Sequence, residues 1–337
     1  MTAAAICRKL RPMATPQTLP RPGPECSVIV PLYGNEENLP ALIERLAALH
    51  AAVPGGIEAV CVVDGSPDRT HALLFEKLPG AAFPSRLLLL SRNFGSFAAI
   101  REGLRAAGGR WFAVMAADLQ EPQSLVEAFF AALRRDEADV VLGTRAARAD
   151  SFVDRAASAV FWGIYRRLIN PELPSGGIDV FGCNHAFRDH LLGFSESHSS
   201  LVGQLLWLGF RRMTVPYSRA ARSAGRSAWT FRRKVTYLMD SVFAFSDLPI
   251  KLFVALGFVG LFTSVTMAAV VIAGRLSGAF DVPGYAATIV SILFFASLNL
   301  FALGIMASYV WRAYENTKAR PLAVVMREDR FQREGTA

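Results

Sequence analysis

Residues 27–38 read SVIVPLYGNEEN, an apolar β-rich run that passes directly into a helical pattern. Residues 27–33 predict a strand, and residues 36–52 predict a helix because leucines and an isoleucine recur on one helical face. An apolar strand followed at once by a helix is the repeating unit of domains built on a parallel sheet.

The same unit recurs along the N-terminal part of the chain. Further strands are predicted over residues 57–63, 86–90, 111–115 and 139–142, with helices opening near Asp68 or Thr70, Gly95, Pro122 and Val153. These strands are apolar along nearly their whole length, as strands are when helices cover both faces of a sheet. The sequence therefore predicts an α/β fold with a mostly parallel sheet and helices on both faces.

Polar residues follow four successive predicted strands, and ligands of such sheets bind outside the carboxyl ends of the strands. The four sets are Tyr33, Gly34, Asn35 and Glu36; Asp64, Gly65, Ser66 and Asp68; Ser91, Arg92, Asn93 and Gly95; and Asp118, Gln120 and Glu121. Any one set resembles an ordinary turn. Four sets at one sheet edge favour a ligand site.

The last of these sets has the chemistry of a metal site. Asp118 and Gln120 stand two residues apart and can direct oxygens to one point, which suits Mg²⁺ or Mn²⁺ completed by diphosphate oxygens and water. Glu121 either orients that shell or opens a helix with a negative first turn. Asp64 and Arg92 have two interpretations as well, contact with a nucleotide or support of the loops.

Two long uncharged runs, residues 252–273 and 282–311, lie near the C-terminus. Each exceeds the roughly 20 residues that cross a hydrocarbon core, and their tandem order disfavours the alternative of buried core helices. Basic residues flank the pair, whereas the loop between the runs carries only Arg275. Two transmembrane helices, about 250–274 and 284–311, are therefore expected, with the catalytic domain and both termini cytosolic.

The charge and the cysteines narrow the class of protein further. The net charge of +8 is concentrated beside the apolar runs, which favours a membrane surface over nucleic acid as the partner. The four cysteines lack the spacing of a metal site, so free thiols are expected. The predicted organisation is a disordered arm (1–25), a catalytic domain (26–220), juxtamembrane interfacial helices (221–248), the transmembrane hairpin (249–312) and a cytosolic tail (313–337).

A series of short motifs resembles family 2 glycosyltransferases, most closely the branch of dolichol-phosphate mannose synthase and bactoprenol glucosyltransferase. The motifs are VIVPLYGNEEN (28–38), VDGSPD (63–68), SRNFG (91–95), DLQEP (118–122), GTR (143–145), DVFGC (179–183) and GRS (225–227). The resemblance implies a GT-A fold and inverting transfer from a nucleotide sugar to a polyprenyl phosphate. The expected location is the cytosolic face of the inner (plasma) membrane, and a homo-oligomer is left open.

The resemblance also implies roles for individual residues. Donor-binding residues would be Pro31, Tyr33, Glu36, Asp64, Arg92 and Asp118; metal ligands Asp118 and Gln120; acceptor-phosphate residues Arg145, Arg155, Ser158 and Ser227; and catalytic residues Asp118, Asp179 and Arg145. Asp179 would lie near the reacting centre, with positioning before proton abstraction as its role.

The chain departs from the family pattern at four positions. Ala116 replaces the first acid of the usual D-x-D pair, Val63 replaces the first acid of D-D-G-S, and Ser96 and Ala228 replace lysines. A transferase with another lipid or polysaccharide acceptor, or a non-catalytic donor-binding scaffold, therefore stays open as an alternative. The Q-x-x-R-W sequence of processive synthases is absent from the chain.

Overall fold

The computed structural model describes residues 24–145, 174, 177–197, 199–218, 239, 242–244, 248–277 and 285–332. Its strands are β1 (Cys26–Leu32), β2 (Ile57–Val63), β3 (Ser85–Leu90), β4 (Trp111–Val114), β5 (Val140–Arg145), β6 (Val180–Asn184), β7 (Arg212–Tyr217) and β8 (Val325–Phe331). The helices are η2 (Glu36–Asn38), α1 (Leu39–Ala52), α2 (Thr70–Lys77), η3 (Leu78–Gly80), α3 (Ser96–Ala106), α4 (Gln123–Arg134), α6 (His185–Gly193), α7 (Leu201–Trp207), α9 (Leu248–Leu276) and α10 (Tyr285–Thr317).

All of these strands form one sheet in the order β7-β5-β6-β4-β1-β2-β3-β8. The pairs β1–β2, β1–β4, β2–β3 and β5–β7 are parallel, whereas β6 runs antiparallel to both β4 and β5. The mostly parallel α/β fold predicted from the sequence is confirmed. Because β6 is antiparallel to both of its neighbours, β4 and β5 run in the same direction. The carboxyl ends of β1 to β5 and β7 therefore share one edge of the sheet, and β6 begins at that edge.

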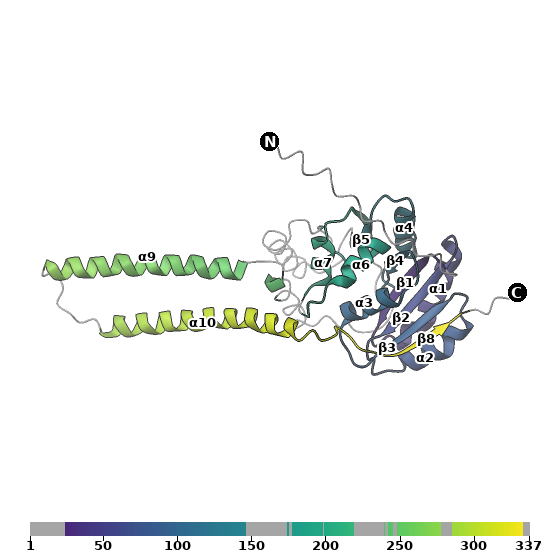
Figure 1. Cartoon of the computed structure of the whole chain (residues 1–337), viewed down its shortest axis with the longest axis horizontal. Coiled ribbons are helices and arrows are strands. Elements are labelled where there is room, and N and C mark those ends of the chain that lie inside the picture. Colours follow the sequence, from purple (N-terminus) through teal and green to yellow (C-terminus); the bar gives the residue numbers. More distant parts are fainter. Residues whose placement is uncertain are drawn as a thin grey trace.

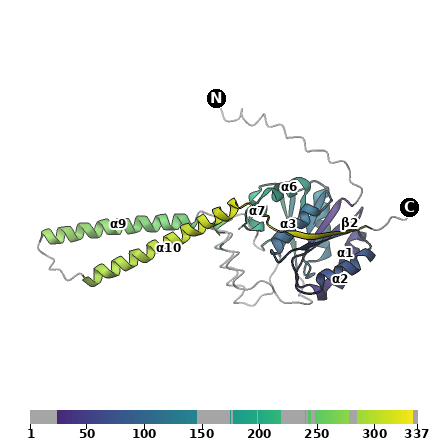
Figure 2. The same cartoon turned by 60° about the horizontal axis from the view of Figure 1, so that its bottom comes forward.

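Helices cover both faces of the sheet, so each strand divides its side chains between two cores (Figures 1 and 2). Val28 and Val30 of β1 pack in the core that contains α1 and α4, whereas Ile29 points into the core of α3, α6 and α7. This alternation explains why the strands are apolar throughout. Within the described residues, the cysteines are buried free thiols, as expected, and burial raises the pKa of Cys61 to about 12.

One strand lies in the segment that the sequence analysis assigned to a cytosolic tail. Residues 325–331 form β8, which runs antiparallel to β3 at the edge of the sheet, and the Ser91 amide donates to the Val324 carbonyl (3.0 Å). Arg86 of β3 binds Glu58 of β2 at 2.6 Å and lies 3.6 Å from Glu328 of β8. Residues 325–331 of the predicted tail therefore belong to the sheet, and their charged sequence is typical of an edge strand.

The helices α9 and α10 run side by side and project away from the sheet (Figures 1 and 2). The rings of Phe253 and Phe301 contact each other at a centroid distance of 5.3 Å. Residues 249–267 of α9 and 294–317 of α10 are long and apolar enough to cross a membrane, by length and composition, and neither segment is buried. The second helix ends at Thr317, beyond the predicted limit at 311.

Candidate active site

The loops after β1 and β2 are bound to each other through backbone groups. The Gly34 amide donates to Ser66 Oγ (2.8 Å) and the Glu36 amide donates to Asp68 Oδ2 (3.2 Å). In return, Glu36 Oε2 accepts from the Arg69 amide (3.1 Å). Glu36, predicted to border the donor, is thus placed at the sheet edge by bonds that join α2 to the first loop.

Asp68 is the centre of this pair of loops. Its Oδ1 accepts from Ser66 Oγ (2.6 Å) and from the Thr70 amide (3.1 Å), which begins α2. Burial acts to raise the pKa of Asp68, but the hydrogen bonds from Ser66, Thr70 and Glu36 outweigh it and hold that pKa below its ordinary value. The carboxylate is therefore ionised at neutral pH and works as a structural acceptor.

Asp64 binds the third loop. The buried carboxylate accepts from the Phe94 amide (2.7 Å) and the Gly95 amide (2.8 Å), one bond to each oxygen. Arg92 is exposed, with its guanidinium carbon 4.1 Å from the Phe94 ring centroid. Both residues predicted to bind the donor lie at the expected edge, where Asp64 fixes the loop that carries Arg92.

Gly65 allows the second and third loops to approach closely. Its φ is +57°, and an added Cβ would lie 2.3 Å from the Arg92 carbonyl carbon and 2.5 Å from the Asn93 nitrogen. Both partners are backbone atoms, so they cannot move aside as a flexible side chain would.

Replacement of Gly65 by alanine should lower the free energy of unfolding by about 3 kcal/mol, from backbone strain and overpacking together. Denaturant unfolding of the purified protein measures this loss. Gly34 is the matched control, since its φ is +66° but no atom lies within 4 Å of an added Cβ. Equal losses for Gly65→Ala and Gly34→Ala would show that the close approach contributes nothing.

The turn after β4 carries the predicted metal ligands in a strained backbone. Leu119, between Asp118 and Gln120, has a φ of +57°, which is unusual for a residue other than glycine. The Gln120 amide lies 3.4 Å from Asp118 Oδ1, and Arg45 of α1 donates to the Glu121 carbonyl (3.0 Å). Strain that the surrounding structure maintains is typical of ligand sites.

This turn differs from a protein cage for a metal. Among the residues that the structure describes, no three His, Cys, Asp or Glu side chains are grouped as metal ligands. Asp118 and Gln120 offer a carboxylate and an amide oxygen, which are hard ligands. The pair fits a divalent cation that takes its remaining ligands from phosphate and water.

A second group of side chains lies at the same sheet edge, at the ends of β5 and β7 and the start of β6. Arg145 donates through Nη2 to Asp179 Oδ1 (2.7 Å) and through Nε to Asp179 Oδ2. Tyr217 donates its hydroxyl to the same Oδ2 (2.7 Å). The parallel register of β5 and β7 sets Arg145 opposite Tyr217, so the three side chains form one hydrogen-bonded group.

The electrostatics of this group fix its protonation. Burial, the hydrogen bond to Asp179 and the nearby Glu121 carboxylate all raise the pKa of Tyr217, which stays a neutral donor. Burial acts to lower the pKa of Arg145, but the bond to Asp179 outweighs it and the pKa is raised. The turn after β4 and the Arg145 group lie at the same edge of the sheet, because both follow the carboxyl ends of parallel strands.

Sequence reasoning missed Tyr217. The residue ends a strand that was not predicted, and its partnership with Arg145 depends on strand register, which no local pattern reveals. Arg155, Ser158 and Ser227, predicted to contact the acceptor phosphate, lie outside the described residues, as do the arm 1–23 and most of residues 221–248. Pro31 lies in β1, and Tyr33 is 44% exposed at the sheet edge.

Replacement of Tyr217 by phenylalanine should lower kcat/KM of the reaction at this site about tenfold, because one hydrogen bond to a charged group is lost while the ring remains. Steady-state kinetics on the purified protein measures the change. Tyr314, an exposed tyrosine near the end of α10, provides the control Tyr314→Phe, which should leave kcat/KM unchanged. If Tyr217→Phe also retains full kcat/KM, Tyr217 has no part in positioning Asp179.

Acid and amide groups in a strained turn, at the carboxyl edge of a mostly parallel sheet in which β6 and β8 are reversed, fit a sugar transferase of the GT-A class. The chain belongs to glycosyl transferase family 2, whose profile matches residues 27–193. It is 30% identical over 302 residues to a protein of Synechocystis sp. described as an uncharacterized glycosyltransferase, covering 89% of this chain and 94% of that protein. The family and the enzyme class predicted from the sequence are confirmed.

The chain is also similar to a further relative and to a solved structure. The chain is 26% identical over 306 residues to the bactoprenol glucosyl transferase of Shigella phage SfV, with 90% of this chain and 98% of that protein covered. Among solved structures it is similar to the mannosyltransferase PcManGT of Pyrobaculum calidifontis, determined in complex with GDP-Man and Mn²⁺. That match has 18% identity and a TM-score of 0.47, with 88% of this chain and 87% of that chain covered.

Proposed function

We propose that this glycosyltransferase moves a sugar from a nucleotide-sugar donor to a polyprenyl phosphate at the cytosolic face of a membrane, with inversion at the anomeric carbon. One observation supports this most strongly. The Asp118–Gln120 turn and the Arg145–Asp179–Tyr217 group lie at the same sheet edge, so the proposed site for a metal diphosphate would share that edge with a cation suited to a second phosphate.

Asp118 and Gln120 would hold Mg²⁺ or Mn²⁺ against the diphosphate of the donor. When bound, such an ion neutralises the negative charge that develops on the leaving nucleoside diphosphate. The remaining donor contacts fall to Pro31, Tyr33 and Glu36 after β1, and to the loops that Asp64 supports. Tyr33 is exposed enough at the edge to stack on a nucleotide base.

Arg145 would bind the acceptor phosphate. Its planar guanidinium matches phosphate oxygens in pairs, and Asp179 with Tyr217 holds the plane in one orientation. A phosphate monoester is already anionic near neutral pH, so attack on the sugar requires no strong base. Asp179, held by a cation and a phenol, therefore acts in positioning, and catalysis rests on alignment and charge stabilisation.

The choice of acceptor is supported by the relatives. The protein of phage SfV is named a bactoprenol glucosyl transferase, and the alignment with it extends over most of both chains. On the family resemblance, Arg155, Ser158 and Ser227 would add to the phosphate site beside Arg145.

The membrane arrangement is supported by the return of the chain to the sheet. The chain leaves the sheet after β7 and rejoins it at β8, with α9 and α10 between these strands. The start of α9 and the end of α10 must then lie on the same side, which is the geometry of a hairpin that crosses twice. Basic residues beside these ends support a cytosolic location of that side, at an inner (plasma) membrane.

The proposal is tested with detergent-solubilised protein, a polyprenyl phosphate, Mn²⁺ and a panel of nucleotide sugars. Mass spectrometry of the lipid fraction should reveal one glycosylated polyprenyl phosphate, and chelation of the cation should abolish it. Failure of every donor in the panel to yield a lipid product would refute the proposed acceptor.

A further inference from the structure

Trp207, the last residue of α7, is the most exposed large apolar residue of the described sheet domain, with 68% of its surface accessible. It is nevertheless held in place, because its ring meets the Phe194 ring edge-on at a centroid distance of 5.5 Å. An exposed, oriented tryptophan is costly in water, and it is typical of a surface that meets a partner.

The loop beneath Trp207 is fixed to the sheet domain. Arg101 of α3 is 4% exposed and donates to the carbonyls of Leu191 (2.9 Å), Leu192 (3.2 Å) and Phe194. These bonds satisfy the carbonyl groups at the end of α6, where the chain turns into residues 194–197. We call residues 194–197 together with Trp207 the Trp207 edge.

The Trp207 edge also contacts the end of α10. The Ser197 amide donates to Asn316 Oδ1 (3.1 Å), in the last turn of that helix. Both overall views place α7 at the side of the domain from which α10 extends (Figures 1 and 2). The Trp207 edge therefore lies beside the last turn of α10, at the height of Asn316 along the axis of that helix.

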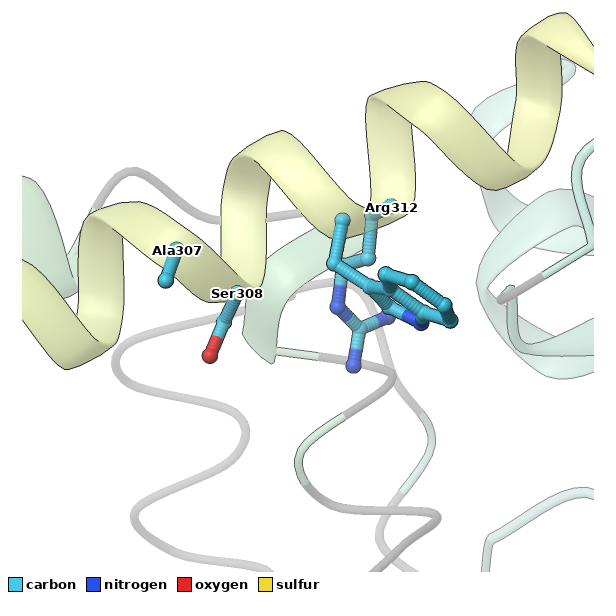
Figure 3. Close-up of a pocket in the computed structure, with 4 residues that line it drawn as sticks. Ala307, Ser308 and Arg312 are labelled. Carbon is cyan, nitrogen blue, oxygen red and sulfur yellow. The ribbon is translucent and has the colours of Figure 1, made fainter.

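The residues around Asn316 mark that level as a membrane interface. Trp311 and Tyr314 are each 55% exposed, and Lys318 Nζ lies 5.2 Å and 4.4 Å from their ring centroids. Ser308 and Arg312 project from one side of the same helix (Figure 3). Aromatic rings with basic neighbours at the end of an apolar helix are typical of the head-group layer. From Trp311 to Asn316 the helix rises only about 7.5 Å.

We infer that the Trp207 edge lies in the head-group layer, with Trp207 inserted among the lipids as a second anchor beside the helix hairpin. The inference rests on the proposed membrane arrangement. Its partner is a bilayer surface, because the edge is continuous with the aromatic end of α10. The domain is then held at two points, so the strand-end site keeps a fixed orientation toward a lipid-borne phosphate.

Phe75 provides a matched comparison in the same domain. It is 40% exposed on α2, and in Figure 1 that helix lies at the end of the domain away from α9 and α10. Its ring contacts Arg327 (4.6 Å) and Phe331 (5.8 Å), both in β8. Of these two exposed aromatic residues, only Trp207 is therefore expected to reach lipid.

The test uses the full chain in vesicles that contain anionic lipid, with Trp207 as the sole tryptophan after replacement of Trp111, Trp162, Trp229 and Trp311 by phenylalanine. Lipids brominated near the head group should lower its emission roughly twofold relative to plain lipids, since an interfacial indole lies within reach of those bromines. A variant in which Phe75→Trp supplies the sole tryptophan, with Trp207→Phe added, should show no loss.

Vesicle flotation of the unmodified chain tests the membrane arrangement separately from the insertion of Trp207. Failure to float would overturn both the membrane arrangement and the Trp207 edge. Flotation with Trp207 emission equal in brominated and plain lipids would overturn the Trp207 edge alone. An emission maximum shifted to the blue but insensitive to bromine would instead show cover by a second copy of the chain.

A second measurement guards against misfolding of the variant with four replacements. Trp207→Cys, in a chain that carries Cys7→Ser, is labelled with a nitroxide, since the described cysteines are buried. Greater accessibility of the label to oxygen than to a water-soluble nickel complex supports insertion. The reverse order contradicts it.

Discussion

Replacement of Asp118 by alanine should lower kcat for sugar transfer about 10³-fold, the largest effect expected of any single change in this protein. Ala116 occupies the position of the family's first acid, so Asp118 supplies the only carboxylate of the pair. Its loss leaves Gln120 as the only protein ligand proposed for the cation, and the departing diphosphate loses its neutralising charge.

Steady-state kinetics across a Mn²⁺ titration measures this effect and separates it from misfolding. Asp118→Asn retains one oxygen ligand, so high Mn²⁺ should restore part of its activity but none of that of Asp118→Ala. Asp189→Ala is the matched control, because Asp189 is a half-exposed carboxylate on α6, which begins at the opposite edge of the sheet. Full transfer by Asp118→Ala would remove the proposed metal site.

Replacement of Arg145 by lysine should lower kcat/KM for the polyprenyl phosphate about 100-fold while the KM for the nucleotide sugar stays unchanged. Lysine keeps the positive charge but has no planar fork, so it cannot hold Asp179 and a phosphate oxygen in the same orientation. The Asp179 carboxylate, 23% exposed, would also lose its paired donor groups.

The control for Arg145 is Arg211, another arginine that donates to carboxylates. Arg211 donates to Asp139 (3.1 Å) and Asp136 (2.6 Å), but it precedes β7 and so lies at the amino edge of the sheet. Arg211→Lys should affect stability without changing the KM of either substrate. A rise in the KM of the nucleotide sugar, with kcat/KM for the polyprenyl phosphate unchanged, would assign Arg145 to the donor rather than to the acceptor.

The first half of the fold could be predicted because each element carries its own local signal. The limits of β2 were predicted as residues 57–63 and are found there, since the strand is apolar throughout and a turn follows at Asp64. The start of α1 was set too early, because Glu36–Asn38 forms a 3-10 turn. Two hydrogen bonds shape this turn: the Asn35 amide donates to Thr70 and the Glu36 amide donates to Asp68. Both acceptors belong to the segment after β2, so the local sequence does not reveal these bonds.

The later strands could not be predicted, because their signals are not local. In β7, Pro216 and polar residues obscure the alternation, and in β8 charged residues dominate the sequence VMREDRF. The pairing of β8 with β3 joins segments separated by both apolar helices. A charged edge strand of this kind is recognised only when its partner is known.

The residues of the candidate site also fall into those with a local sequence signal and those without one. Asp118, Gln120, Arg145 and Asp179 were identified from their motifs, and the structure places them at the predicted sheet edge. Tyr217 was missed because strand register alone brings it to Asp179. Asp64 and Glu36 lie at the expected edge, where Asp64 supports the third loop, one of its two predicted interpretations. The bond by which Glu36 joins the first loop to the start of α2 was not predicted.

The central claim, that a phosphate on a polyprenyl chain is the acceptor, is tested most directly by a choice between matched lipids. Vesicles containing the full chain receive equal amounts of a polyprenyl phosphate and the corresponding polyprenol, together with Mn²⁺ and the donor found active in the panel. Mass analysis should detect sugar on the phosphate only, with none on the free alcohol. Sugar found on the alcohol, or on diacylglycerol supplied in the same way, would contradict the account.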